Sequence, residues 1–146
     1  MGMQTFAPSR HRAALSVVLI ALIIGCSKGM PTEVSDDTTV ALRVNKPVSI
    51  EDKSIVMNVV RIENDSRCPT DVSCVSAGNA VVVFTAEFGN LPVIPAEQFV
   101  NTTIEPRSAT VGSYAFRLDS LTPRPISTAT IAQSQYVAHM TVSAAK

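Results

Sequence analysis

The segment NAVVVFTAEF, residues 79–88, decides the fold class of this chain. Its side chains alternate, and one face carries Ala80, Val82, Phe84, Ala86 and Phe88. The opposite face starts with valines and becomes polar toward its end, at Thr85 and Glu87. Alternation with a period of two, in β-branched and aromatic residues, is typical of a strand that covers a protein core.

Six further segments carry the same pattern. They are rich in valine, isoleucine and threonine, and proline, glycine and asparagine separate them. We expect strands at residues 39–44, 48–50, 54–63, 98–105, 113–118 and 135–142. About seven antiparallel strands predict an all-β fold, specifically an immunoglobulin-like β-sandwich, which we favour over a small closed barrel.

The alternation also predicts which side chains form the core. The largest ones expected inside are Phe84, Phe116, Tyr136 and Met140. Segment 54–63 is apolar on both faces, which predicts a central or well-covered strand. Its faces would carry Ile55, Met57 and Val59 on one side and Val56, Val60 and Ile62 on the other. The chain of 146 residues has room for one such domain, expected at 38–146.

The first residues differ from the rest of the chain. Arg10, His11 and Arg12 precede an apolar run, residues 13–24, in which Ser16 is the polar exception. A helix of about 12 residues rises about 18 Å, well short of a bilayer core of about 30 Å. The run is therefore typical of the apolar part of a signal peptide, which we expect at residues 1–25.

Ile23-Ile24-Gly25-Cys26 ends this run and resembles the lipobox of bacterial lipoproteins. The resemblance implies that the Cys26 thiol receives a diacylglycerol group, that a peptidase cuts before Cys26, and that the new amine is acylated with a chain such as palmitate. Two or more acyl chains hold a protein stably in a membrane, so the membrane would be a partner of this end. The alternative is that Cys26 is a buried cysteine near the end of an ordinary helix.

Residues 26–37 are expected to be a flexible, lipid-bearing tether, since their polar composition buries too little apolar surface to order them. Ser27, and not an aspartate, follows Cys26. The resemblance then implies a lipid-anchored protein of the cell envelope, at the outer membrane if the host has one and otherwise on the outer face of the cell membrane.

The charge of the chain excludes nucleic acid as an expected partner. The chain has 12 basic and 12 acidic side chains, and residues 1–25 contain Arg10 and Arg12 but no acid, so the mature chain carries −2. Nucleic-acid binding needs a concentrated basic face, and no basic cluster follows residue 25.

A polar segment, residues 63–79, separates two strong strands and contains Cys68 and Cys74. Exported chains meet oxidising surroundings, so we expect these cysteines to form a disulfide. Closing a loop of about seven residues contributes about 2.4 kcal/mol in the chain-entropy model. We also expect Arg67 to brace the loop through Asp65 or Asp71. An exposed Arg67 that binds an anionic ligand is the alternative.

The same segment is a poor match to a metal or redox site. Two cysteines without a nearby histidine do not supply the four ligands of a zinc site. Calcium could use Glu63, Asp65 and Asp71, but their order matches no calcium loop. A redox pair is disfavoured because five residues separate Cys68 from Cys74 where such pairs have two. We therefore expect no metal and no cofactor.

A second resemblance covers residues 38–143. DSRCP at 65–69, Val72, Cys74 and Ala77-Gly78 resemble the pattern D-S-R-C-P-x-x-V-x-C-x-W-A-G of small uncharacterised bacterial exported proteins. YAFRL at 114–118 and Pro123-Arg124-Pro125 match a later part of the same proteins. Ser76 lies where the pattern has tryptophan, which removes an aromatic side chain that could stack on a ligand. The resemblance brings no established activity.

No catalytic set is expected. His139 is the one histidine of the mature chain and is expected on the surface. The acidic pairs Asp36-Asp37 and Glu51-Asp52 fall in the tether and a turn, and no glycine-rich phosphate loop is present. The sequence therefore predicts a membrane-anchored, non-enzymatic binding or envelope-structural module. The alternative is an enzyme or metallochaperone that uses the Cys68/Cys74 loop.

Overall fold

A computed structural model of the chain describes residues 36–89 and 96–145. The expected signal peptide, Cys26 and nearly all of the expected tether lie outside these residues. Within the two described ranges, no helix is long and apolar enough to cross a membrane.

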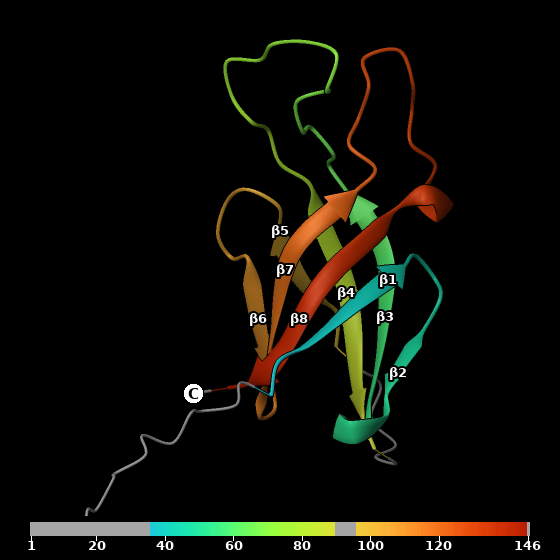
Figure 1. The fold of residues 1–146 in the computed structure, drawn as a ribbon, viewed down its shortest axis with the longest axis vertical. Coiled ribbons are helices and arrows are strands. Elements are labelled where there is room, and N and C mark those ends of the chain that lie inside the picture. Colours follow the sequence, from blue (N-terminus) through green and yellow to red (C-terminus); the bar gives the residue numbers. More distant parts are fainter. Residues whose placement is uncertain (1–35, 90–95, 146) are drawn as a thin grey trace, which may run out of the picture. The chain divides into compact units, whose positions relative to one another are not determined.

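The described residues form eight strands in two antiparallel sheets of four (Figure 1). The first sheet contains β1 (Thr38–Arg43), β6 (Ser108–Val111), β7 (Tyr114–Thr122) and β8 (Val137–Ala144). The second contains β2 (Val48–Ile50), β3 (Ile55–Glu63), β4 (Val81–Phe88) and β5 (Gln98–Asn101). Two single-turn 3₁₀ segments, η1 (Glu51–Lys53) and η2 (Gln133–Gln135), complete the elements. The expected all-β antiparallel sandwich is confirmed.

Strand order follows the chain. The sheets run β1-β8-β7-β6 and β2-β3-β4-β5, so every described pair except β1 with β8 joins consecutive strands. The chain crosses between sheets after β1 and after β5. Hairpin-type connections of this kind keep pairing between neighbours in the chain, while the first strand pairs with the last and forms one edge of its sheet.

One core lies between the sheets. Phe84 of β4 and Phe116 of β7 are fully buried, and their ring centroids are 5.6 Å apart in a tilted arrangement. Tyr136 and Met140 are also buried, as the alternation predicted. Burying large aromatic side chains from both sheets supplies much of the stabilisation of a sandwich of this size.

The structure corrects the expected faces of β3. The pairing with β4 passes from Val59–Phe84 to Arg61–Val83, so Val60 is an extra, bulged residue. Because a one-residue shift exchanges the two faces of a strand, Ile62 turns into the core. Ile62 is only 6% exposed and shares the core face with Ile55, Met57 and Val59, so its expected place on the face of Val56 and Val60 was wrong. A second bulge at Asp119 in β7 turns Leu121 inward in the same way.

The expected strand at 98–105 was too long, and the short strand β6 was not expected. β5 ends at Asn101, and the next two residues bind the segment just before β4: the Thr102 N–H donates to the Ala80 carbonyl at 3.0 Å, and Thr102 Oγ1 donates to Asn79 Oδ1 at 3.2 Å. The Thr103 N–H donates to Asn79 Oδ1 at 3.1 Å, and the Ala80 N–H donates to Thr102 Oγ1 at 2.9 Å. The chain therefore turns toward the other sheet, where β6 pairs with β7.

Candidate functional site

Three loops lie at the same end of the sandwich (Figure 1). The cysteine loop, residues 64–80, joins β3 to β4; the β5–β6 loop is residues 102–107; and the β7–β8 loop is residues 123–136. The start of β1 lies at the opposite end, as does the end of the chain that is marked C. We call the three loops together the loop end.

A buried ion pair lies at the base of the cysteine loop. Arg67 Nε donates to Asp65 Oδ1 at 2.8 Å, and Arg67 Nη2 donates to Asp65 Oδ2 at 2.7 Å. The two side chains are only 8% and 12% exposed, so the pair is shielded from water. The expected bracing of the loop by Arg67 thus uses Asp65, in a two-point geometry that holds both side chains in one orientation.

Arg67 also joins the cysteine loop to the β7–β8 loop. Its guanidinium donates to the carbonyl oxygens of Leu121 and Pro123, the latter at 2.9 Å. Tyr136 completes the cluster, because its hydroxyl donates to Asp65 Oδ2 at 2.9 Å and its ring lies 6.0 Å from the guanidinium carbon. The sequence pattern placed Tyr136 in the core and did not indicate that it is a partner of Asp65 and Arg67.

The cluster shifts two pKa values in opposite directions. Burial favours the neutral form of Asp65, but hydrogen bonds from Arg67 and Tyr136 outweigh it and hold the pKa of that carboxyl below its usual value. Burial, together with the hydrogen bond to Asp65, raises the pKa of Tyr136 to about 12. At neutral pH the cluster therefore contains a carboxylate, a guanidinium and a neutral phenol.

Asp71 binds the other loop and not Arg67. Its carboxylate accepts hydrogen bonds from the hydroxyl and the backbone N–H of Ser127, the latter at 2.8 Å, which lower the pKa of Asp71. Nearby, the Thr70 N–H donates to the Pro125 carbonyl at 2.9 Å. These contacts join positions more than 50 residues apart in the chain, which the sequence could not indicate. The two loops are thus linked near their tips as well as at their bases.

The expected disulfide is present between Cys68 and Cys74, whose Cα atoms are 5.9 Å apart. The bonded sulfurs offer no thiolate for a metal or for redox chemistry at neutral pH. Among the described residues, no group of three or more His, Cys, Asp or Glu side chains could hold a metal ion.

Glycine at position 78 is required by the way the cysteine loop closes. The Ser66 N–H donates to Asn79 O at 2.7 Å and the Cys68 N–H donates to Ala77 O at 2.8 Å, so the two ends of the loop run side by side. Between them Gly78 has a φ of +66°, and a Cβ there would lie 1.8 Å from the Ser66 carbonyl oxygen. A larger residue would force the two ends apart.

Reduction of the disulfide is expected to loosen the cysteine loop without unfolding the domain. The bond contributes about 2 kcal/mol by loop closure, against about 5–15 kcal/mol for a whole domain. Hydrogen exchange with and without reductant measures this: amides at 64–78, including Thr70, should exchange faster, while those of β4 keep their protection. Equal acceleration in β4 would show that the bond, and not the core, holds the fold.

Exposed aliphatic side chains lie on all three loops. Val72 and Val75 belong to the cysteine loop, Ile104 to the β5–β6 loop and Ile126 to the β7–β8 loop. Val75 is fully exposed and the other three are about half exposed. Of the five large hydrophobic residues exposed in the described chain, only Phe99 lies outside these loops. Single exposed aliphatics are ordinary, but their concentration at one end marks a candidate contact surface.

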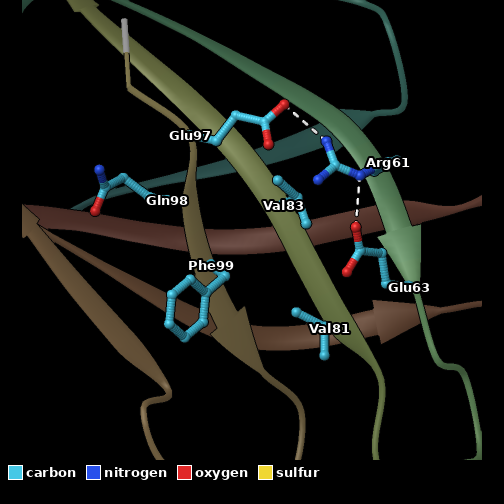
Figure 2. Close-up of a pocket in the computed structure, with 7 residues that line it drawn as sticks. All are labelled: Arg61, Glu63, Val81, Val83, Glu97, Gln98 and Phe99. Carbon is cyan, nitrogen blue, oxygen red and sulfur yellow. Dashed lines mark hydrogen bonds and ion pairs between the residues drawn. The ribbon is translucent and has the colours of Figure 1, made fainter.

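A hollow of about 340 Å³ lies on the outer face of the β3–β4–β5 sheet (Figure 2). Val81 and Val83 form its floor beside the exposed ring of Phe99. Arg61 contributes one charge there, and both of its carboxylate partners, Glu63 at 2.6 Å and Glu97 at 2.7 Å, lie in the same hollow. Its charged groups thus pair with one another beside an apolar floor.

The residues considered for acid–base chemistry have structural partners. Lys53 is buried and its Nζ binds Asp36 at 2.8 Å and Asp52 at 3.2 Å, so one carboxylate from each acidic pair holds this lysine. His139 is half-buried in β8, with Nε2 3.5 Å from the Thr122 hydroxyl. Neither arrangement brings a nucleophile together with a base.

Comparisons with protein-family models, with curated proteins and with solved structures find no match to this chain.

Proposed function

We propose that this protein is a membrane-anchored lipoprotein of the cell envelope whose domain is a non-enzymatic binding module. Its binding surface is the loop end. The observation that carries the proposal is the placement of four exposed aliphatic side chains on three loops at the end opposite the start of β1. A tether that ends in a lipidated Cys26 would enter at that opposite end and leave the loops free to meet a partner.

The way the loops are joined supports a binding surface rather than a set of independent loops. Arg67 joins the cysteine loop to Leu121 and Pro123, and Asp71 joins it to Ser127. Asn79 joins it to the β5–β6 loop. Pre-ordered loops lose less entropy on binding than free ones, which favours recognition by shape.

The module is immunoglobulin-like in layout, as a two-sheet scaffold that presents loops at one end. Its strand order differs from that of immunoglobulin domains, because every described pair except β1 with β8 joins consecutive strands where those domains use Greek-key connections. Many sandwich domains share the architecture without the exact topology, and loops on a rigid scaffold are where such domains bind.

Site-specific photo-crosslinking in cells tests the proposal. A photoreactive residue replaces Val75 in the cysteine loop or Ser113, an exposed residue of the β6–β7 turn at the opposite end. Crosslinks to one defined envelope component are expected from position 75 and not from position 113. Equal labelling from both positions, or none from either, contradicts a binding surface at the loop end.

The same cells test the anchor. The unaltered chain is expected to partition into the membrane and detergent phases, and the Cys26→Ser variant is expected to leave them, because a lipid on Cys26 is the proposed attachment. A Cys26→Ser chain that still fractionates with membranes and is trimmed at the same place would show that the lipobox interpretation is wrong.

A further inference from the structure

A small groove of about 280 Å³ lies at the loop end, between all three loops. Its apolar lining residues are the exposed Ala77 and Leu121, whose side chain is buried in the core, and Thr102, Thr103 and Ser120 bring hydroxyl groups to it. Its charged lining groups are Arg67 and Arg124, and no carboxylate lines it. A concave site with an apolar floor and a few convergent polar groups is the usual form of a small-ligand site.

The two arginines differ in what they can offer a ligand. Arg67 is buried, and its charge is balanced by the two-point contact with Asp65. Arg124 is exposed, and within the described chain its guanidinium makes one hydrogen bond, from Nη2 to the Cys68 carbonyl at 3.3 Å. A guanidinium has five N–H donors, so most of those of Arg124 remain for a ligand.

Other hollows of the described chain show that this arrangement is distinctive. In the hollow on the outer sheet face, two glutamates bind the one arginine (Figure 2). A third hollow, of about 220 Å³, contains Arg107 and Arg117 but also Glu105 in its lining. The groove at the loop end combines a cation free of carboxylate partners with hydroxyl donors and the apolar side chain of Ala77.

We propose that this groove binds an oxyanion, the carboxylate or phosphate group of a small ligand. The Arg124 guanidinium forms charge-assisted hydrogen bonds with the anion, and the hydroxyls of Ser120 and Thr103 donate to its remaining oxygens. The Ser120 hydroxyl makes no hydrogen bond with any described residue and is available for this. Ala77, the exposed apolar residue of the lining, contacts the apolar part of the ligand that carries the anion.

This inference deepens the proposed function, since it names the ligand chemistry recognised at the same loop end. The site is partly open to water, where charge–charge attraction is screened. A simple anion that lacks the rest of the ligand should therefore bind weakly, with a dissociation constant of about 1 mM or above. Binding should weaken as salt concentration rises.

Two-dimensional NMR titration of the full chain in micelles of an uncharged detergent tests the inference. Inorganic phosphate is the probe in one arm and acetate in the other, at constant ionic strength. Saturable shifts are expected for the amides of Thr103, Ser120 and Arg124 in at least one arm. Saturation by phosphate alone would show that the site recognises a phosphate group. Saturation by acetate alone would show that it recognises a carboxylate.

Two variants separate the groove from general surface charge. Arg124→Gln keeps a polar side chain but removes the charge, and binding should weaken at least tenfold. Arg107→Gln changes the net charge equally at an exposed position outside the groove, and binding should stay as in the unaltered chain.

No saturable shift with either anion overturns the inference, and so does equal binding by the unaltered chain and Arg124→Gln. The proposed function fails separately, through the crosslinking result at position 75. Crosslinks at position 75 without anion binding would leave the loop end as a binding surface and remove only the oxyanion site.

Discussion

Truncation of Phe84 or Phe116 to alanine lowers the free energy of unfolding by about 3–5 kcal/mol. Both side chains are fully buried, and they touch across the two sheets with their centroids 5.6 Å apart. Each truncation removes buried apolar surface and leaves a cavity where the sheets meet. Against a total of about 5–15 kcal/mol, either variant is expected to be marginally folded.

Denaturant unfolding followed by circular dichroism measures this effect. Phe99→Ala is the matched control, because the same side chain is 58% exposed on the outer face of β5. We expect it to change stability by about 0.5 kcal/mol or less. Equal losses from Phe99 and Phe84, or a spectrum dominated by helix, would contradict the sandwich.

The second large effect is expected from Arg67→Leu, with a loss of about 3–5 kcal/mol. The substitution removes the two-point contact with Asp65 and leaves that carboxylate buried without its cationic partner. It also leaves the carbonyls of Leu121 and Pro123 without the donor that joins them to the cysteine loop. Leucine fills similar space, so lost packing contributes little.

Arg117→Leu is the control for this variant. Arg117 also pairs with an aspartate, Asp119 at 2.9 Å, but its side chain is 63% exposed. Exposed pairs contribute about 0.2–1 kcal/mol, so the two losses should differ several-fold. If both variants unfold at the same denaturant concentration, burial of the Asp65–Arg67 pair has no energetic importance.

The pH dependence provides a further check on the same pair. The pKa of Asp65 is lowered in the folded chain, so its stabilisation is complete above the ordinary value of 3.8 and is lost as pH falls through the lowered pKa. In Arg67→Leu the buried carboxylate is relieved by protonation. Without Arg67, burial raises the pKa of that carboxyl, so the stability difference between the unaltered chain and the variant should begin to shrink above pH 3.8 and shrink further as the pH falls through the lowered pKa of the unaltered chain.

Local pattern determined the strands and much of the core. Alternation in residues 79–88 placed Phe84 inside β4, and a similar alternation placed Met140 inside β8, because successive side chains of a strand point to opposite faces. Cys68 and Cys74 were paired from the oxidising environment expected of an exported chain, and the bond is present. These properties depend on neighbours in sequence or on composition, so one sequence suffices to predict them.

Only the tertiary structure decided how the strands are bulged and which loops meet. The bulge at Val60 turns Ile62 into the core, and it depends on the register with β4, not on the residues of β3 alone. The sequence likewise left Asp65 and Asp71 as equal partners for Arg67. Asp65, and not Asp71, pairs with Arg67 in a fold where Tyr136 binds Asp65 and Ser127 binds Asp71. Both of these partners come from outside the cysteine loop. A buried polar group must find its partners wherever the fold places them, and such partners leave no periodic or local signal in the sequence.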